Sequence, residues 1–173
     1  FMERGLPIAM SRERNTGAMY HAKFGDKLSI QSGVFGEGDS FGNNKEAINN
    51  VNITSRITYL AINNNRKLLH LGASNSIRKN NDNTYKISSR AENHLGSKLI
   101  DAAFEDIDES NLLGGEFAYV NNSFSLQGEY LQTTLIGVTE TKLSSYYSQI
   151  SYFLTGESRP YKSSLDGFSR VKP

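Results

Sequence analysis

Charged and polar side chains recur at every second position in several stretches of this 173-residue chain. His21 and Lys23 are separated by one residue, and so are Gln127 and Glu129. Spacing of this kind places each pair on one face of a β-strand. A strand face that carries such groups can bind ions and donate hydrogen bonds, provided that the surrounding sequence forms the strands that hold it.

No arrangement in the sequence indicates a catalytic or metal centre. The histidines His21, His70 and His94 share none of the short spacings typical of zinc ligands. The acidic run 101–109 offers oxygen ligands for calcium, but it lacks the EF-hand spacing and is better interpreted as a solvated loop. The chain has no Cys, which excludes disulfides and thiolate metal sites. We therefore expect no enzyme activity, no metal and no cofactor.

The composition favours many short strands joined by polar turns. The chain has nine Tyr, nine Phe and 15 Gly but only three Pro, and its mean hydropathy is -0.50. A net charge of +1 does not indicate a nucleic-acid surface. No apolar run approaches the ~20 residues of a membrane helix, whereas a barrel strand needs only ~9–11 alternating residues. The chain opens at Phe1 with no signal peptide, so we expect it to be part of a longer protein.

Alternating patterns and turn residues predict three hairpins and two further strands. The predicted hairpin strands are 18–24 with 28–34, 53–62 with 68–78, and 113–120 with 124–130. The further strands, 85–91 and 146–154, bring the total to about eight. The acidic stretch 97–110 is predicted to be either a short helix or a long loop, and 133–143 to be a loop. One helical turn is predicted at 45–48.

The predicted connections alternate in length along the chain. Short turns lie near residues 26, 65 and 121, and long connections lie at 36–52 and 92–111. Outer-membrane barrels combine short periplasmic turns with longer external loops. A soluble antiparallel sheet can show the same alternation, so the pattern alone leaves a membrane barrel and a soluble β-barrel or sandwich equally open.

Several sequence landmarks occur in a fixed order. They are FMERGLP at 1–7, GEFA at 115–118, FSLQGEY at 124–130, SYFLTGE at 151–157, RPY at 159–161, GF at 167–168 and RVKP at 170–173. In these landmarks the chain resembles the phosphate-selective porin O and P family of Gram-negative outer membranes. One departure is Ala91, where the family pattern has Pro.

The resemblance implies an all-β fold, an antiparallel transmembrane β-barrel of the porin type. This chain would supply about eight strands from the middle of a barrel of about 16 strands, a size that encloses an aqueous channel. Residues 1–173 would form one barrel segment, with 1–15 as the end of the loop that narrows the channel and 16–173 as barrel strands and loops.

The same resemblance implies a porin of the bacterial outer membrane. Its water-filled channel would pass small inorganic anions, such as phosphate or polyphosphate, by passive diffusion. The full-length protein would contact outer-membrane lipids and assemble as a homotrimer, with no nucleic-acid partner.

Two groups of channel residues follow from this resemblance. Arg4, Arg12 and Arg14 are candidates for anion contacts at the constriction, because a guanidinium fork can bind two phosphate oxygens; ordinary surface charges are the alternative. With the apolar strand faces toward lipid, the opposite faces would line the channel. The lumen-lining candidates are His21, Lys23, Gln31, Arg56, His70, Glu116, Gln127 and Glu129.

Glu157, Arg159 and Pro160 are expected to fix a turn at the membrane boundary through a charge pair or hydrogen bonds. Tyr152 and Tyr161 are expected in the aromatic girdle of the barrel.

Two other functions stay open at this point. One is a soluble or surface β-barrel or sandwich that binds a glycan or peptide. The other is a non-functional porin remnant. A soluble sheet would show the same alternation of apolar and polar residues, so dependence on detergent is the property that separates the first alternative from a porin.

Overall fold

A computed structural model of the chain describes residues 6–11, 15–37, 51–64, 66–80, 83–90 and 96–171. The predicted anion contacts Arg4, Arg12 and Arg14 lie outside these residues, and so does the helical turn predicted at 45–48. Strands make up most of the described structure, which confirms the all-β prediction.

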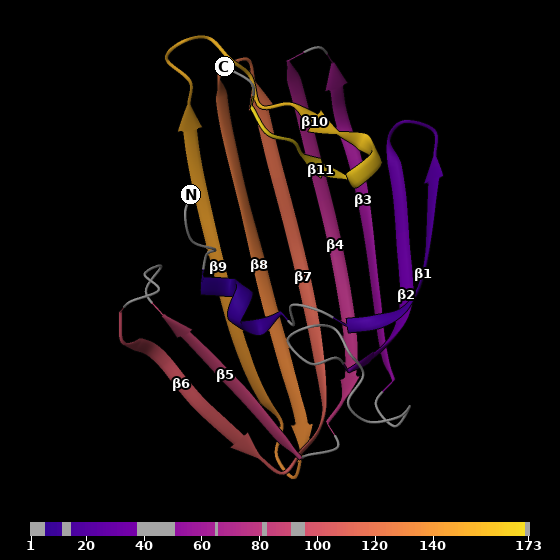
Figure 1. Cartoon of the computed structure of the whole chain (residues 1–173), viewed down its shortest axis with the longest axis vertical. Coiled ribbons are helices and arrows are strands. Elements are labelled where there is room, and N and C mark those ends of the chain that lie inside the picture. The colour runs from indigo at the N-terminus through magenta and orange to yellow at the C-terminus, as the bar shows by residue number, and fades with distance from the viewer. Residues whose placement is uncertain are drawn as a thin grey trace.

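Seven antiparallel strands lie side by side in one sheet, in the order β1-β2-β3-β4-β7-β8-β9 (Figure 1). They are β1 (Asn15–Phe24), β2 (Leu28–Glu37), β3 (Asn52–Asn64), β4 (Lys67–Lys79), β7 (Ile107–Asn121), β8 (Phe124–Gly137) and β9 (Thr141–Tyr152). Strands β1 and β9 are the two edges, so the described strands form an open sheet. A closed barrel stays a prediction.

Tight turns at one end of the sheet confirm the three predicted hairpins. The β1–β2 and β7–β8 turns each contain a residue with positive φ, Gly25 at 61° and Asn122 at 54°. Glycine and asparagine tolerate this left-handed backbone better than other residues do. Arg66, with φ 65°, lies in the β3–β4 turn.

The prediction of a short helix or a long loop at 97–110 was wrong. This stretch contains β6 (Lys98–Glu105) and the start of β7. Strand β6 pairs with β5 (Thr84–Arg90) in a separate two-stranded sheet, where Phe104 lies opposite Tyr85. The apolar partners come from another strand, so the local acidic pattern could not reveal them. The strand predicted at 85–91 thus corresponds to β5, outside the main sheet, and the main sheet of the described residues has seven strands and not about eight.

The loop predicted at 133–143 was also wrong. Strand β8 continues to Gly137, and β9 begins at Thr141, so only 138–140 connect them. Thr133 pairs with Leu143 across the two strands, and β-branched residues such as Thr suit a pleated sheet. Strand β9 also ends at Tyr152, two residues before its predicted end.

The strands present two different faces. On one, here called the apolar face, the large apolar side chains are exposed: Tyr20, Phe24, Val34, Ile53, Ile57, Tyr59, Leu71, Ile77, Leu113, Phe117, Tyr130, Tyr146, Ile150 and Tyr152. By strand alternation, the charged residues on this face are Lys67, Lys79, Glu109 and Lys142, each within two positions of a strand end. Among the described residues, the middle of the apolar face therefore carries no charge.

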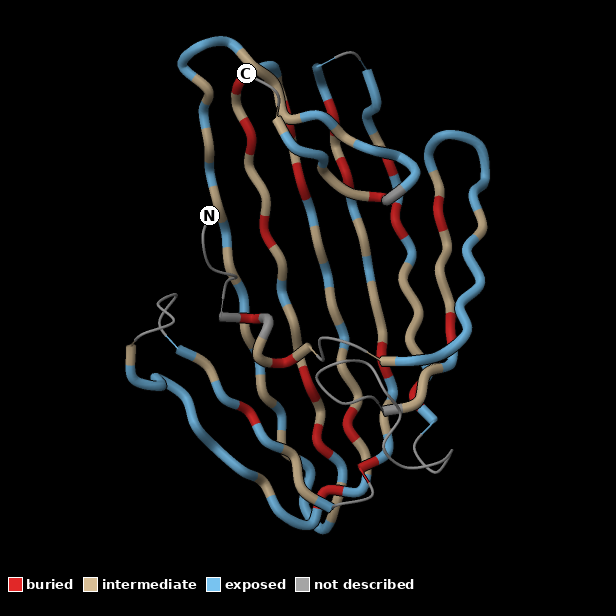
Figure 2. The backbone as a smooth tube through the Cα atoms, in the orientation of Figure 1, coloured by how far each residue is buried: buried red, intermediate tan, exposed pale blue. Residues whose placement is uncertain are grey.

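The opposite, polar face is partly covered by later and earlier parts of the chain. After β9 the chain turns back across this face through β10 (Tyr161–Lys162), η2 (Ser163–Leu165) and β11 (Gly167–Phe168) (Figure 1). The 3-10 helix η1 (Leu6–Met10) contacts β5, β8 and β9. Buried positions along the strands are coloured red in Figure 2.

No helix among the described residues is long and apolar enough to span a bilayer.

Candidate functional site

Residues 157–170, here called the docked segment, cross the polar face almost from edge to edge. Arg159 Nη1 donates to Gln127 Oε1 on β8. Tyr161 contacts β4, and Asp166 contacts β1 and β2. The segment therefore connects strands that are far apart in the sheet.

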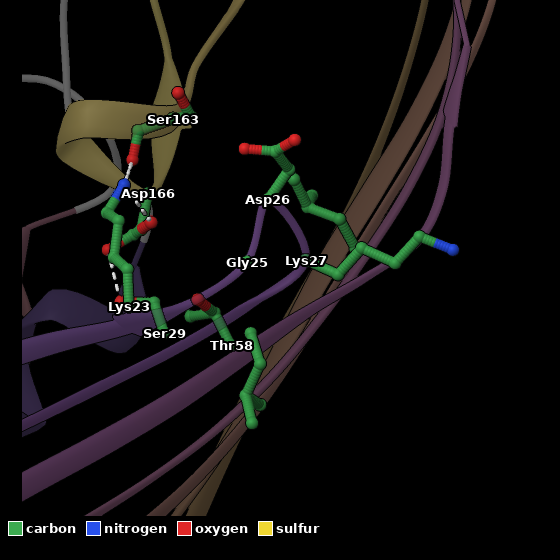
Figure 3. A pocket seen from close by; sticks show the side chains of 10 residues that line it. Lys23, Gly25, Asp26, Lys27, Ser29, Thr58, Ser163 and Asp166 are labelled. Atoms are coloured by element: carbon green, nitrogen blue, oxygen red, sulfur yellow. Dashed lines mark hydrogen bonds and ion pairs between the residues drawn. The ribbon is translucent and has the colours of Figure 1, made fainter.

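The Asp166 carboxylate is surrounded by donors from the first hairpin. Ser29 Oγ donates to Oδ2 at 2.7 Å and Gln31 Nε2 at 3.0 Å. His21 Nε2 lies 3.1 Å from the same oxygen, and Lys23 Nζ lies 3.2 Å from Oδ1. Lys23 also donates to the Ser163 carbonyl (Figure 3).

The alternation of the hairpin explains this arrangement. His21 lies opposite Gln31, and Lys23 lies opposite Ser29, in the β1–β2 register. Two cross-strand pairs on one face thus place four polar side chains within reach of a single carboxylate.

Burial and hydrogen bonding act on Asp166 in opposite directions. Only 5% of the residue is exposed, and this burial by itself would raise the pKa of the carboxyl group. Hydrogen bonds from Ser29 and Lys23, the Lys23 charge and the Gln31 hydrogen bond outweigh it, so the pKa of Asp166 lies below its usual value. Asp166 is therefore an anion at neutral pH.

A second charged cluster lies at the centre of the polar face. Arg56 on β3 forms an ion pair with Glu116 on β7, and its Nε donates to Oε1 at 3.0 Å. His70 Nε2 lies 3.0 Å from the same oxygen. Strand β4 runs between β3 and β7, so the Glu116 side chain has to cross it.

Gly72 on β4 makes this crossing possible. A Cβ at position 72 would lie 2.3 Å from Glu116 Oε1. The missing side chain therefore leaves the space in which the Glu116 carboxylate reaches Arg56.

Glu116 lies directly opposite Glu129 in the β7–β8 register. Like charges in this position repel. Glu116 turns toward Arg56, whereas Glu129 accepts a 2.9 Å hydrogen bond from Tyr147 Oη on β9. The partners of Glu116 thus lie on β3 and β4, whereas the partner of Glu129 lies on β9.

Tyr161 anchors the middle of the docked segment. Its hydroxyl lies 2.9 Å from His70 Nδ1, and its ring stacks edge-on against Phe168 at 5.5 Å. Both rings pack on a small buried cluster of Leu60, Leu68 and Val120. Burial, followed by the nearby Asp166 charge, raises the pKa of Tyr161 to about 12, so its hydroxyl stays protonated and can donate.

A basic cavity of about 310 Å³ lies where the docked segment meets the β3–β4 turn. Its charged lining consists of Arg66, Lys67 and Arg159, with Asn63 and Asn64 beside them. The described residues that line this cavity include no Asp or Glu.

The predicted lumen-lining residues share the polar face, as the alternation indicated. They are His21, Lys23, Gln31, Arg56, His70, Glu116, Gln127 and Glu129. The structure brings His21, Lys23 and Gln31 together around Asp166, and Arg56, His70 and Glu116 into the central cluster. That this face borders a channel stays a prediction.

The predicted turn residues have separate partners. Glu157 accepts a hydrogen bond from Thr155, and Arg159 lies 4.2 Å over the Phe168 ring. Pro160 is exposed and lies next to Tyr161. Tyr161 packs on the polar face, so its predicted place in an outward aromatic girdle was wrong.

The whole chain matches a known family. The sequence model of the phosphate-selective porin O and P family covers residues 1–173. The chain belongs to this family. A curated relative, "Porin O" from Pseudomonas aeruginosa strain PAO1, is 26% identical over 180 residues. The alignment includes 91% of this chain but only 40% of the relative, so the chain spans less than half of that porin.

Sequence reasoning about this porin family member missed the central group of the site, Asp166. Ser29, 137 residues away, is its closest hydrogen-bond partner, and no local pattern marks such a contact. A weak sequence signal was present: Asp166 directly precedes Gly167 of the landmark at 167–168, and an Asp-Gly pair is typical of turns. The role of Gly72 also left no local signal, because it depends on the Glu116 side chain, which reaches from β7 across β4 to Arg56 on β3.

Proposed function

We propose that this chain forms part of the wall of an outer-membrane porin, whose water-filled channel passes small inorganic anions by passive diffusion. One observation carries the proposal: the exposed, charge-free middle of the apolar face extends across seven strands. Exposed apolar patches of this extent mark a protein or membrane interface. The polar face would then border water.

The energetics favour lipid as the partner of the apolar face. A Lys or Arg facing lipid costs about 2–4 kcal/mol near the bilayer midplane and little near its boundaries. Lys67, Lys79 and Lys142 lie near strand ends, where this cost is small. Membership of the porin family supports the same assignment.

The basic cavity supports anions as the solutes. Two of its cations, Arg66 and Arg159, lie off the apolar face, and the described lining residues include no Asp or Glu, so these cations would attract anions to this end of the sheet. Arg4, Arg12 and Arg14 remain proposed contacts at the constriction. On the polar face, Lys23 and Arg56 each pair with a carboxylate, so we propose that they shape the wall more than they attract anions.

Ion selectivity of the full-length protein in a planar bilayer tests the proposal. We expect discrete conductance steps and a reversal potential in a KCl gradient that shows anion preference. Arg66→Ala should reduce this preference, whereas Arg90→Ala, on the separate β5–β6 sheet, should leave it unchanged. Cation preference in the parent protein would exclude the anion assignment.

Solubility tests the membrane assignment independently. We expect the full-length protein in the outer-membrane fraction, extracted only by detergent and migrating as a trimer after cross-linking. Recovery in the soluble fraction without detergent would favour a β-sheet binding module instead.

A further inference from the structure

The Asp166 carboxylate occupies a complete anion site. Both carboxylate oxygens have partners, and these partners come from two paired strands of the sheet, not from the docked segment that carries Asp166. Ser29 is itself buried, with 4% of its surface exposed. The donors of the site therefore belong to the sheet, whereas the carboxylate that fills the site belongs to the docked segment.

Space is available beside the carboxylate. A cavity of about 50 Å³ is lined in part by Lys23, Ser29, Thr58 and Asp166. The labelled side chains in Figure 3 show Asp166 and Lys23 at one side of this space and Thr58 at the other. Removing the Asp166 side chain would enlarge the cavity next to the same donors.

The backbone at Asp166 permits that removal. Its φ of 46° lies in the left-handed region, which glycine adopts without steric cost. Asp166→Gly therefore removes a CH₂–COO⁻ group and leaves a turn that suits the new residue. The group removed has the size and charge of acetate.

We propose that His21, Lys23, Ser29 and Gln31 form a binding site for small carboxylate anions, and that Asp166 occupies it as a tethered ligand. A free carboxylate that displaces Asp166 releases the docked segment from β1 and β2. The consequence for conduction rests on the proposed channel function, but binding itself does not.

Acetate titration of the full-length protein in detergent tests the site, with ¹³C-acetate NMR or calorimetry as the readout. In the parent protein, acetate competes with a tethered carboxylate at an effective concentration in the millimolar range or above. We expect acetate to bind Asp166→Gly at least about tenfold more tightly than the parent, a difference of about 1.4 kcal/mol.

Three variants act as controls. Asp166→Asn leaves a neutral occupant that Lys23 holds less firmly than a carboxylate, so acetate should bind this variant more tightly than the parent and less tightly than Asp166→Gly. Asp26→Asn removes a carboxylate from the exposed β1–β2 turn beside the same cavity and should behave like the parent. Lys23→Met in the Asp166→Gly background should abolish the gained affinity.

Equal acetate affinity in the parent and in Asp166→Gly would overturn the proposal, and so would a gain that survives Lys23→Met. If Asp166→Gly does not fold, spin labels at Asp26→Cys and Ser164→Cys in the parent decide the question. Their distance distribution should broaden with acetate and not with chloride at equal ionic strength. Loss of conductance without loss of acetate binding would refute only the channel function.

Discussion

The apolar and polar faces of the sheet use alternate residues of the same strands, yet they are completed in opposite ways. Within the described chain, the middle of the apolar face carries no charge and stays exposed. The polar face collects carboxylates, cations and histidines, which pair with one another and with the docked segment. Alternation thus decides which residues share a face, whereas distant parts of the chain decide which of them form contacts.

The largest expected effect comes from placing a charge on each face in turn. Tyr20 and Met19 are neighbours on β1, and both are exposed, at 70% and 58%, but they lie on opposite faces. Tyr20→Lys should destabilise the full-length protein in lipid vesicles by about 2–4 kcal/mol, because it places a cation in lipid. Met19→Lys should change stability little. Denaturant titration in vesicles measures both, and equal costs would refute the assignment of the faces.

The central ion pair should have the next largest effect. Arg56→Ala leaves the partly buried Glu116 with His70 alone, and the free energy of unfolding should fall by about 1–3 kcal/mol. A double-mutant cycle with Glu116→Gln should show coupling between the two residues. Additive costs would mean that the pair contributes nothing to stability.

Gly72→Ala should disturb the same pair by a smaller amount. The new Cβ would force the Glu116 carboxylate away from Arg56, at a cost of about 1 kcal/mol. Gly115→Ala is the matched control, because no atom lies within 4 Å of a Cβ at that position. If Gly72→Ala lowers the free energy of unfolding by the same amount in the parent protein and in the Arg56→Ala variant, the space at Gly72 is not what permits the ion pair.

Acid should release the docked segment, the smallest of these effects near neutral pH. Because its pKa is lowered, ionised Asp166 stabilises docking above the usual value of 3.8, and this contribution is lost as pH falls through the lowered pKa. The charged and titratable groups near Asp166 are His21, Lys23 and Tyr161, and Arg56 donates to the Asp166 carbonyl. A spin label at Ser164→Cys should therefore gain mobility in acid, and Asp166→Asn should remove the pH dependence.

The fold was predictable from the sequence where each strand carries its own pattern. Tight turns and alternation identified the three hairpins, and the polar face was assigned residue by residue. Strand β6 was missed because its apolar partners, Tyr85 and Ile87, lie on β5. The same limit applies to the site: His21 and Lys23 were recognised, but Asp166 reaches them through tertiary contacts that no local spacing records.

The docked segment also has a mechanical consequence. Arg159 contacts β8, and Asp166 contacts β1 and β2. Between them, Tyr161 packs on the buried cluster that β3, β4 and β7 contribute. Adjacent strands rotate about one another by roughly 20–25°, and backbone pairing alone leaves that angle adjustable. Because the docked segment is attached to the sheet at three points, it limits the rotation of six strands relative to one another. The short stretch from Arg159 to Asp166 therefore helps to set how sharply the sheet can curve.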